Sequence, residues 1–242
     1  MNPQEILIQL VEMSQTLARP EWDCVILGEG NTSARADEDS FWVKASGAYL
    51  STAGPDNYVR CRFGPVLDFV ASEEPGDAAV ATALAAAAIE PVGLSPSIET
   101  VFHGYLLSQP GVNFVAHTHP TAVNAVISSV NGEELARQRL TPPEVAFCGP
   151  VFCWVPFADP GVGLARAVPR AVERFREEHG ELPRVILAQN HGLIALGGTA
   201  EEVLTTTLTM VKTARILLGA LLCGGPLFLP PEDVARLTGG AA

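Results

Sequence analysis

Three of the five histidines in this 242-residue chain lie in two short motifs that could bind a metal ion. His117 and His119 follow an apolar stretch, residues 111–116, whose length suits a β-strand. Side chains two residues apart on a strand point to the same face, so both imidazoles can reach one ion. His191 follows a second apolar stretch, residues 184–188. Three imidazoles with one open position are typical of a catalytic zinc site, so the motifs predict a metalloenzyme.

Each histidine also has a plainer interpretation. His117 and His119 could be the polar end of a strand, and His191 a hydrogen-bonded loop residue. The grouping of three histidines in two short motifs favours the metal site over these alternatives. The remaining two, His103 and His179, are interpreted as a helix histidine and a solvated helix end.

The residues around these motifs predict how the histidines are positioned. Pro120 can begin a helix over residues 121–127, because proline is well tolerated at the first helical position. The histidine pair then lies at a strand-to-helix corner. In parallel α/β sheets, ligands bind at such corners, at the carboxyl ends of the strands. His191 is expected in a tight connection between two buried strands, residues 184–188 and 193–196.

The spacing of apolar residues predicts the other elements of the fold. Helices are expected at residues 5–18, 77–89, 97–108, 120–128, 133–140, 162–178 and 201–218, and strands at 25–27, 41–43, 112–117, 151–155 and on both sides of His191. This alternation predicts an α/β fold, a central β-sheet covered by helices on both faces. The length suits one such domain, so residues 1–242 are expected to form a single domain.

Composition and charge narrow the class of protein. The formal net charge of −12 argues against a nucleic-acid partner, because such a surface needs clustered Lys and Arg. Five cysteines without a C-x-x-C pair are typical of reduced thiols in a cytosolic protein. The first residues carry no basic n-region. The apolar segments 78–89 and 216–229 are shorter than the roughly 18 residues that span a bilayer. We therefore expect a cytoplasmic protein without a membrane partner, whose apolar segments pack inside the fold or against another subunit.

Small-residue turns follow two of the predicted strands. Such turns let backbone N–H groups converge on a phosphate or a carboxylate. The first turn, residues 27–33, superficially resembles a dinucleotide fingerprint, but Ser33 stands in place of the third glycine. The second turn, residues 43–47, ends in Ser46-Gly47. An ordinary tight turn remains the alternative for both segments.

Glu99 is an acidic residue that could take part in the same chemistry as these motifs. It lies in the first turn of the helix predicted at residues 97–108. A carboxylate at that position interacts favourably with the helix dipole, which is its plain interpretation. A carboxylate near a metal ion can also move protons in a reaction, provided that its pKa is tuned towards neutrality.

Five motifs, in this order, resemble the class II aldolase and adducin family, which includes L-fuculose-1-phosphate and L-rhamnulose-1-phosphate aldolases. They are Gly30-Asn31-Thr32-Ser33, Ser46-Gly47, Ser97-Ile98-Glu99, His117-Thr118-His119-Pro120 and Asn190-His191-Gly192. The resemblance covers roughly residues 25–198. It implies a three-layer αβα sandwich assembled as a cyclic homotetramer, with active sites at the subunit interfaces.

The resemblance also implies roles for individual residues. His117, His119 and His191 would bind Zn²⁺ or another divalent ion such as Mn²⁺, Co²⁺ or Fe²⁺, and Glu99 would be the catalytic acid/base. The substrate phosphate would be bound by Gly30, Asn31, Ser46, Gly47 and Ser97. The implied reaction is the cleavage of a carbon–carbon bond in a ketose phosphate or a related sugar acid, through a metal-stabilised enediolate.

Elementary chemistry agrees with this assignment. A dication bound to both oxygens of an enediolate lowers the barrier to its formation by several kcal/mol. The rival Schiff-base mechanism needs a reactive lysine, and the chain has two lysines, Lys44 and Lys212. Ile98 stands where fuculose-phosphate aldolases usually carry a second serine, so sugar acids stay open beside sugar phosphates. Candidates for the interface tyrosine of those aldolases are Tyr49, Tyr58 and Tyr105.

Other functions remain open at this point. The same family includes epimerases, decarboxylases and dehydratases that act on similar sugar acids and phosphates. A metal-free, adducin-like interaction module is a further alternative, which the three histidines and Glu99 argue against. The H-x-H-x-D-H cluster of metallo-hydrolases is absent from the sequence.

Overall fold

The computed structural model describes residues 2–72, 76–91 and 93–239. At its centre is an eight-stranded sheet with the order β4-β3-β2-β1-β5-β8-β7-β6. The strands are β1 (Asn31–Arg35), β2 (Ser40–Lys44), β3 (Tyr58–Arg62), β4 (Ala88–Glu90), β5 (Phe114–Thr118), β6 (Cys153–Val155), β7 (Val185–Ala188) and β8 (Gly192–Gly197). Strands β6 and β7 pair in parallel, and the other neighbouring strands pair antiparallel.

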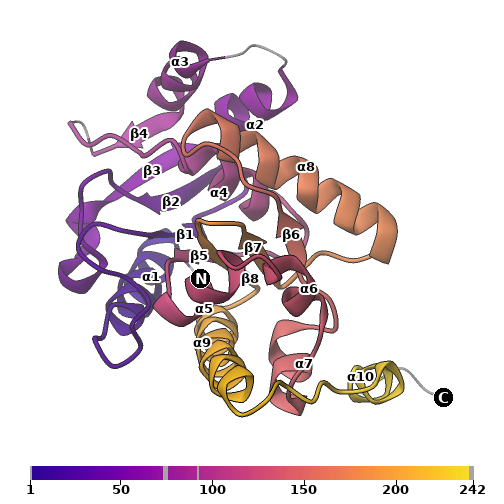
Figure 1. Cartoon of the computed structure of the whole chain (residues 1–242). Helices are drawn as coiled ribbons and strands as arrows, with labels where there is room; N and C mark the ends of the chain where they lie inside the picture. Colours follow the sequence, from indigo (N-terminus) through magenta and orange to yellow (C-terminus); the bar gives the residue numbers. More distant parts are fainter. Residues whose placement is uncertain (1, 73–75, 92, 240–242) are drawn as a thin grey trace.

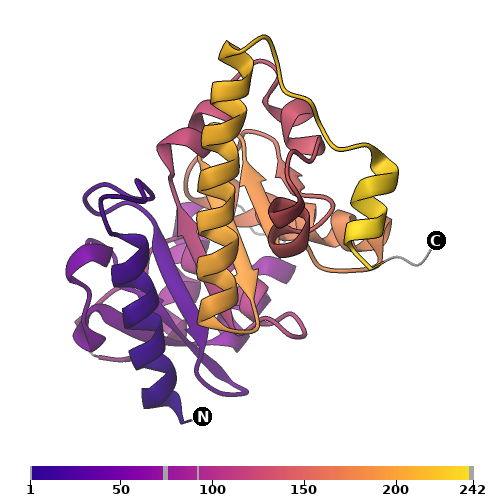
Figure 2. The same ribbon diagram turned by 90° about the horizontal axis from the view of Figure 1, so that it is seen from below.

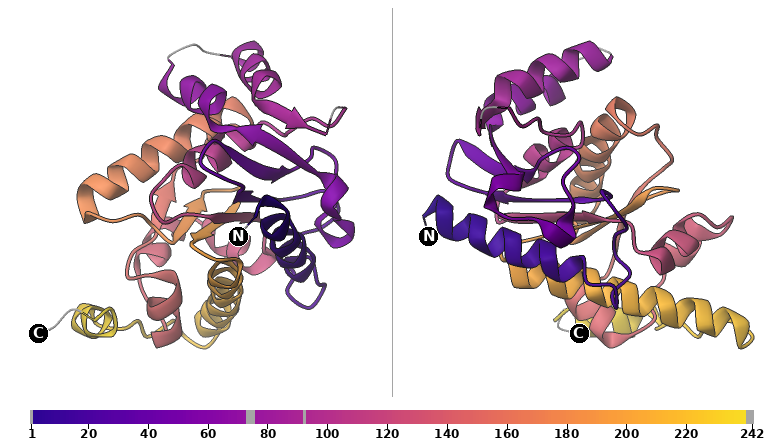
Figure 3. Two further views of the ribbon diagram at one scale, coloured as in Figure 1. Left: turned by 180° about the vertical axis from the view of Figure 1, so that it is seen from behind. Right: turned by 90° about the vertical axis from the view of Figure 1, so that its left-hand side faces the viewer.

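Helices cover both faces of this sheet, which confirms the expected three-layer αβα architecture (Figures 1 and 3). One layer contains α2 (Phe63–Ala71), α3 (Asp77–Ala87), α4 (Thr100–Leu107) and α8 (Val162–His179). The other contains α1 (Pro3–Leu17), α5 (Thr121–Ile127) and α9 (Ala200–Leu222), and Figure 2 shows α1 and α9 lying on the same face. The shorter helices α6 (Gly132–Arg137), α7 (Pro142–Cys148) and α10 (Pro231–Leu237) complete the fold, with two 3₁₀ turns, Leu50–Thr52 and Pro55–Asn57.

Strands β5, β7 and β8 are buried on both faces, so they read as nearly continuous apolar stretches. In β5, Val115 points into the core beneath α4 and α8, whereas Phe114 and Ala116 point towards α1. His117 follows Val115 by two residues and therefore faces the α4 side. The metal motif thus lies on the face of the sheet that α4 covers.

Helix α4 is buried along its whole length. A helix that is apolar on all sides belongs in the core of a protein. Gly104 allows its close approach to the sheet, since a Cβ atom there would lie 2.7 Å from Val66 Cγ1 and 3.0 Å from Phe41 Cζ. This packing fixes the start of α4, and with it Glu99, against the sheet.

Several expected elements differ in the structure. The expected strand at residues 25–27 is wrong: Ile26 and Leu27 are exposed, and Leu27 has a φ of 55° in a turn. The helix expected at residues 77–89 ends at Ala87, and the chain continues into β4. The pattern missed β1, β3, β4, α2, α7 and α10. Among the described residues, no helix is long and apolar enough to cross a membrane.

Candidate metal centre and acid–base site

The two histidine motifs meet because three antiparallel strands place their ends at one edge of the sheet. Asn31, the first residue of β1, pairs with His117 near the end of β5. Thr118 pairs with Leu193 at the start of β8, directly after His191 and Gly192. The expected strand-to-helix corner is therefore present, but it combines the carboxyl end of β5 with the amino ends of its neighbours. It is not the edge of a parallel sheet.

His117, His119 and His191 converge with spacings that suit one metal ion. Their ligand atoms all lie within 4.8 Å of one another. The Nε2 atom of His117 lies 3.1 Å from that of His191 and 2.9 Å from that of His119. Zinc–nitrogen bonds of 2.0–2.1 Å at tetrahedral angles place two nitrogens about 3.3 Å apart. The donor set and its spacing therefore fit a zinc-sized divalent ion.

Hydrogen bonds orient two of the three histidine residues. His117 Nδ1 lies 3.1 Å from the Leu193 carbonyl oxygen, to which it donates. Such a bond leaves the Nε2 lone pair directed at the other imidazoles, as metal-ligating histidines require. The Asn124 side chain donates to the His191 carbonyl oxygen at 3.0 Å. Asn124 thereby ties α5 to the loop that carries the third imidazole.

The neutral state of the His119 ring favours metal binding. Burial, together with the neighbouring His117 and His191, lowers the pKa of His119 to about 3. The ring is therefore neutral at physiological pH, and a neutral imidazole is the form that binds a metal ion.

Two glycines allow the chain to pass close to the histidines. A Cβ atom on Gly192 would lie 2.7 Å from His119 Cδ2, 2.7 Å from the Thr118 carbonyl oxygen and 2.9 Å from His117 Cε1. A Cβ atom on Gly30 would lie 2.5 Å from the His117 carbonyl oxygen, and Gly30 also has a φ of 66°. Both positions lack room for a side chain, so these glycines belong to the construction of the site.

Glu99 lies against the histidines, immediately before α4. Its Oε1 atom is 3.3 Å from His191 Nε2 and 3.6 Å from His117 Nε2, while Asn31 Nδ2 donates to Oε2. Burial alone would raise the pKa of this carboxyl group. The adjacent imidazoles of His117 and His191 and the hydrogen bond from Asn31 instead hold that pKa well below its ordinary range. The carboxylate is therefore ionised, in its proton-accepting form, rather than tuned towards neutrality.

The predicted anion-binding residues lie around the same edge of the sheet. Ser46 and Gly47 are exposed in the turn after β2, and Gly47 has a φ of 77°. The Ser46 N–H is already used, because it donates to the Ser95 carbonyl oxygen at 2.9 Å. Within the described residues, the buried Ser97 hydroxyl has no hydrogen-bond partner. A buried polar group without a partner is costly, so Ser97 is suited to receive a ligand.

Lys44 joins the two small-residue turns, which the sequence did not predict. Its ammonium group donates to the Ala48 carbonyl oxygen at 2.6 Å and lies 3.5 Å from that of Gly28. Burial lowers the pKa of Lys44, and the nearby Glu99 carboxylate opposes that shift. Lys44 ends β2, two residues before Ser46, and this position in the sequence could have indicated that it lies beside the second turn.

His103 is a second residue whose role the sequence did not reveal. The expectation that it lies in a helix is confirmed, but its ring bonds to Ser33 and Asn31 in β1. The three candidate tyrosines lie in different surroundings. Tyr58 donates to the Ser14 hydroxyl in α1, and Tyr105 is buried in the core on the α4 side of the sheet. Tyr49 is exposed.

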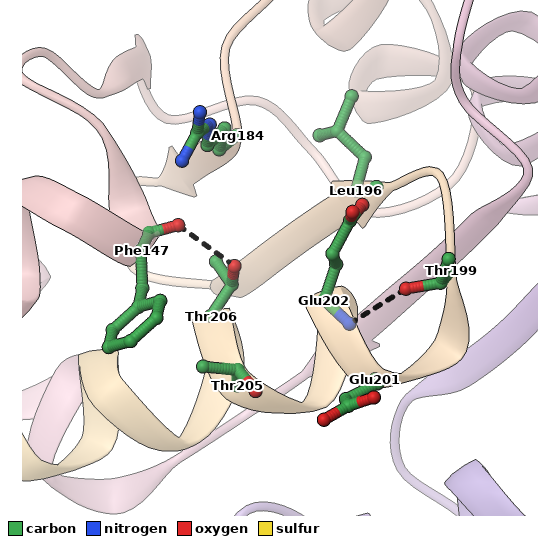
Figure 4. Close-up of a pocket in the computed structure, with 9 residues that line it drawn as sticks. Phe147, Arg184, Leu196, Thr199, Glu201, Glu202, Thr205 and Thr206 are labelled. Atoms are coloured by element: carbon green, nitrogen blue, oxygen red, sulfur yellow. Dashed lines mark hydrogen bonds between the residues drawn. The ribbon is translucent and has the colours of Figure 1, made fainter. Parts of the chain in front are cut away.

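A cavity of about 440 Å³ lies at the opposite end of β8 from Gly192, around the first turns of α9 (Figure 4). Polar groups that line it are used in hydrogen bonds within the protein. Thr206 donates to the Phe147 carbonyl oxygen at 3.1 Å, and Thr199 accepts from the Glu202 N–H at 3.1 Å as a helix cap. We therefore assign this cavity to helix packing rather than to the chemistry.

Comparisons with known proteins relate the chain to one family and to several individual proteins. Residues 8–218 match the model of the family described as class II aldolase and adducin N-terminal domain. Methylthioribulose-1-phosphate dehydratase of Bacillus subtilis (strain 168) is 26% identical over 202 residues, covering 82% of the chain and 85% of that protein. The uncharacterized oxidoreductase YuxG of the same organism is 28% identical over 220 residues, or 85% of the chain. The chain spans 30% of the length of YuxG.

A solved structure also shares the fold. YgbL from Klebsiella pneumoniae, known as a putative aldolase/epimerase/decarboxylase, superposes with a TM-score of 0.75 at 20% identity. The match covers 98% of the chain and 99% of YgbL. At that identity, the likeness shows the fold alone.

Proposed function

The chain belongs to the class II aldolase and adducin family, and from that premise we propose that it is a metal-dependent aldehyde-lyase. In this proposal it cleaves a carbon–carbon bond in a ketose phosphate or a related sugar acid. The observation that carries the proposal is one carboxylate, Glu99 Oε1, set 3.3 Å and 3.6 Å from two imidazoles of a three-histidine cluster. Such a cluster, with an ionised carboxylate beside it, suits proton transfer next to a bound carbonyl.

His117, His119 and His191 would hold Zn²⁺ or another divalent ion such as Mn²⁺, Co²⁺ or Fe²⁺. When bound, the ion would supply charge stabilisation to the enediolate that forms as the bond breaks, which lowers the barrier by several kcal/mol. The residues fit this role because their nitrogens have metal-ligand spacing and His119 is held neutral.

Glu99 would move the proton. Its carboxylate is ionised and has one oxygen, Oε1, directed at the cluster, so it can accept a proton from a substrate carbon and return it. Asn31 holds the other oxygen. General acid–base catalysis by a positioned side chain contributes about 10²- to 10⁴-fold to a rate.

The substrate's anionic group would bind between the two small-residue turns. Gly30, Asn31, Ser46 and Gly47 line these turns, and an amide nitrogen has two N–H bonds, so Asn31 can serve both Glu99 and a substrate oxygen. The buried Ser97 hydroxyl would gain a partner there. Lys44 would add positive charge at the base of the site.

Ile98 bears on the choice between phosphate and carboxylate. Its side chain packs on the apolar cluster of α2, α3 and α4, and its Cδ1 atom would lie 3.7 Å from a Cβ on Gly161. It supplies no hydroxyl for a second hydrogen bond to a phosphate. A sugar acid therefore stays beside a sugar phosphate as the proposed substrate class.

A sibling reaction is the second candidate. The relationship to methylthioribulose-1-phosphate dehydratase favours it, because that relative is matched along 85% of its length. A dehydratase, an epimerase or a decarboxylase would use the same cluster and the same carboxylate. A non-catalytic, adducin-like module is disfavoured by the assembled histidines and by the buried network around Glu99.

We also propose that the enzyme is a cytoplasmic homotetramer with active sites at subunit interfaces. Its five cysteines are free thiols, as is usual in a reducing compartment. Exposed apolar side chains support the assembly. Leu222, the last residue of α9, is 90% exposed, Leu227, which follows the helix, is 92% exposed, and Leu27 at the start of the first turn is 73% exposed. Soluble monomers rarely expose such patches, and contacts between identical subunits would cover them.

The test is a product screen with the zinc-loaded protein. Ketose phosphates and sugar acids are incubated with it, and NMR follows the release of an aldehyde, carbon dioxide or a dehydrated product. Aldehyde release supports the lyase, whereas carbon dioxide or a dehydrated product supports a sibling reaction. Glu99→Gln should keep the metal and lose about 10²- to 10⁴-fold in turnover, while Glu12→Gln, on the exposed side of α1, should match the parent. Equal turnover in Glu99→Gln would refute the acid/base role.

A further inference from the structure

His103 is a buried titratable residue that neither the metal centre nor the proposed acid–base step uses. It lies one helical turn after Glu99, and its N–H donates to the Glu99 carbonyl oxygen at 3.2 Å. Its ring is fully buried. Nδ1 lies 2.6 Å from Ser33 Oγ, and Nε2 is hydrogen-bonded to Asn31 Oδ1. Both nitrogens are thus engaged with strand β1.

These contacts form one continuous chain of hydrogen bonds, from Ser33 through His103 and Asn31 to Glu99. Asn31 Nδ2 donates to Glu99 Oε2, and Glu99 Oε1 is left facing the histidine cluster. The chain therefore connects a wholly buried hydroxyl to the carboxylate proposed to move protons. Its four members come from β1 and from the start of α4, which the fold brings together.

The chemistry of the donors fixes the direction of this chain. An ionised carboxylate only accepts hydrogen bonds, so the NH₂ end of the Asn31 amide must face Glu99. The amide oxygen then faces His103 and only accepts, so Nε2 must carry the proton. A neutral imidazole has one donor and one acceptor, so Nδ1 accepts from the Ser33 hydroxyl. The reversed chain would place the Asn31 oxygen against the carboxylate, which requires a proton on Glu99.

We propose that His103 is a positioning residue, which in its Nε2-protonated tautomer fixes the amide of Asn31 and thereby holds the Glu99 carboxylate towards the metal centre. Ser33 selects the tautomer. The side-chain torsion of a glutamate carboxylate is broad and roughly two-fold, so Glu99 needs an external anchor at Oε2. The catalytic consequence rests on the proposed function, whereas the tautomer and the amide orientation do not.

Burial supports the neutral ring that this role requires. It lowers the pKa of His103 to about 3, with a smaller contribution from His117 that Glu99 opposes. The ring therefore stays uncharged at physiological pH. An uncharged ring keeps one acceptor nitrogen for Ser33 and one donor nitrogen for Asn31.

The tautomer can be measured without a substrate. In zinc-loaded protein with ¹⁵N-labelled histidine, two-bond NMR correlations should show His103 neutral, with Nε2 protonated and Nδ1 bare; His103→Gln identifies its signals. An Nδ1-protonated or cationic ring at neutral pH would overturn the proposal. This readout is independent of any activity, so it remains decisive even if the proposed lyase reaction fails.

The amide anchor gives a second readout. The Asn31 side-chain N–H signals are assigned by their loss in Asn31→Ala. Their hydrogens should exchange slowly with water in the parent and in His103→Gln. The glutamine amide in that variant can donate a hydrogen bond near the position of Nε2. The Asn31 hydrogens should exchange faster in His103→Leu, which donates nothing. Unchanged Asn31 signals in a folded His103→Leu variant would reduce His103 to a packing role. If His103→Leu does not fold, the tautomer measurement on the parent decides.

A turnover measurement then links the anchor to catalysis, using the substrate that the product screen identifies. Loss of a group that supports a catalytic residue typically costs about 10- to 100-fold. His103→Leu should show this loss, and His103→Gln should restore most of it. The double variant His103→Leu/Asn31→Ala should lose no more than Asn31→Ala alone. Additive losses would show that His103 does not act through Asn31.

Discussion

Gly192 provides a sharp test of whether the three histidines form one tightly built site. An alanine there would place a Cβ atom 2.7 Å from His119 Cδ2, 2.9 Å from His117 Cε1 and 2.7 Å from the Thr118 carbonyl oxygen. Real Cβ atoms do not approach this closely, so both rings and the Thr118 backbone must shift. His119 has room to swing away because its side chain is 21% exposed. A bound ion removes that freedom by holding the rings in place.

The cost of Gly192→Ala should therefore appear in metal binding. Overpacking of a well-packed region costs about 1–3 kcal/mol, and about 1.4 kcal/mol corresponds to a tenfold change in affinity. We expect Zn²⁺ to bind about 5- to 100-fold more weakly, measured by competition with a chromophoric chelator. The clash with the Thr118 carbonyl oxygen should in addition lower the unfolding free energy of the metal-free protein.

Gly219→Ala is the matched control. Gly219 lies inside α9, and no atom is within 4 Å of an added Cβ. Alanine should stabilise that helix by about 0.5–1 kcal/mol and leave the zinc affinity unchanged. Zinc binding by Gly192→Ala as tight as in the parent would refute the close packing of the histidines around one ion.

Three further predictions concern stability and assembly. The pKa of His103 is lowered to about 3 in the fold, so below about pH 6.5 the unfolded state binds the extra proton and stability falls as the pH falls. In urea titrations of metal-free protein, the difference in unfolding free energy between the parent and His103→Gln should shrink by up to about 1.4 kcal/mol per pH unit from pH 6.5 to 3. Parallel stability curves for the two proteins would contradict this. Arg139 and Glu144 form a buried pair at 3.0 Å, so Arg139→Met should lose about 3–5 kcal/mol of unfolding free energy and Arg139→Met/Glu144→Leu less; a larger loss in the double variant would contradict it. Light scattering should give the parent a tetramer's mass and Leu221→Glu/Leu222→Glu a smaller one, whereas a fully active 25.5 kDa parent would defeat the shared-site proposal.

The metal motif was predictable because its information is local. His117 and His119 are two residues apart at the end of an apolar stretch, and that spacing alone directs them to one face. His191 needed only a second strand end nearby. The layers were predictable for the same reason, since the long helices α1, α8 and α9 and the strands β5, β7 and β8 carry their own apolar patterns. The family resemblance then joined Glu99 to the histidines, which spacing alone did not do.

The remaining features depend on contacts between distant segments. His103 and Asn31 are 72 positions apart and meet because α4 packs on β1. Lys44 acquires its place through carbonyl groups of two turns. The antiparallel order of the sheet was not predicted, because strands buried on both faces have similar apolar patterns whichever way their neighbours run.

Local signals failed in two other ways. Residues 25–27 are apolar but form an exposed turn, so composition over three residues was too little evidence for a strand. Helix α7 was missed although its start is marked by a capping box between Thr141 and Glu144 and by proline in the first turn.

The central claim is that one divalent ion is bound by three imidazoles beside Glu99, and metal analysis of the purified protein tests it most directly. We expect one ion per chain in the parent and in His179→Ala, whose ring lies at the end of α8. His117→Ala, His119→Ala and His191→Ala should each lose most of the metal while remaining folded. A triple alanine variant that retained one ion per chain would place the metal elsewhere and contradict the account.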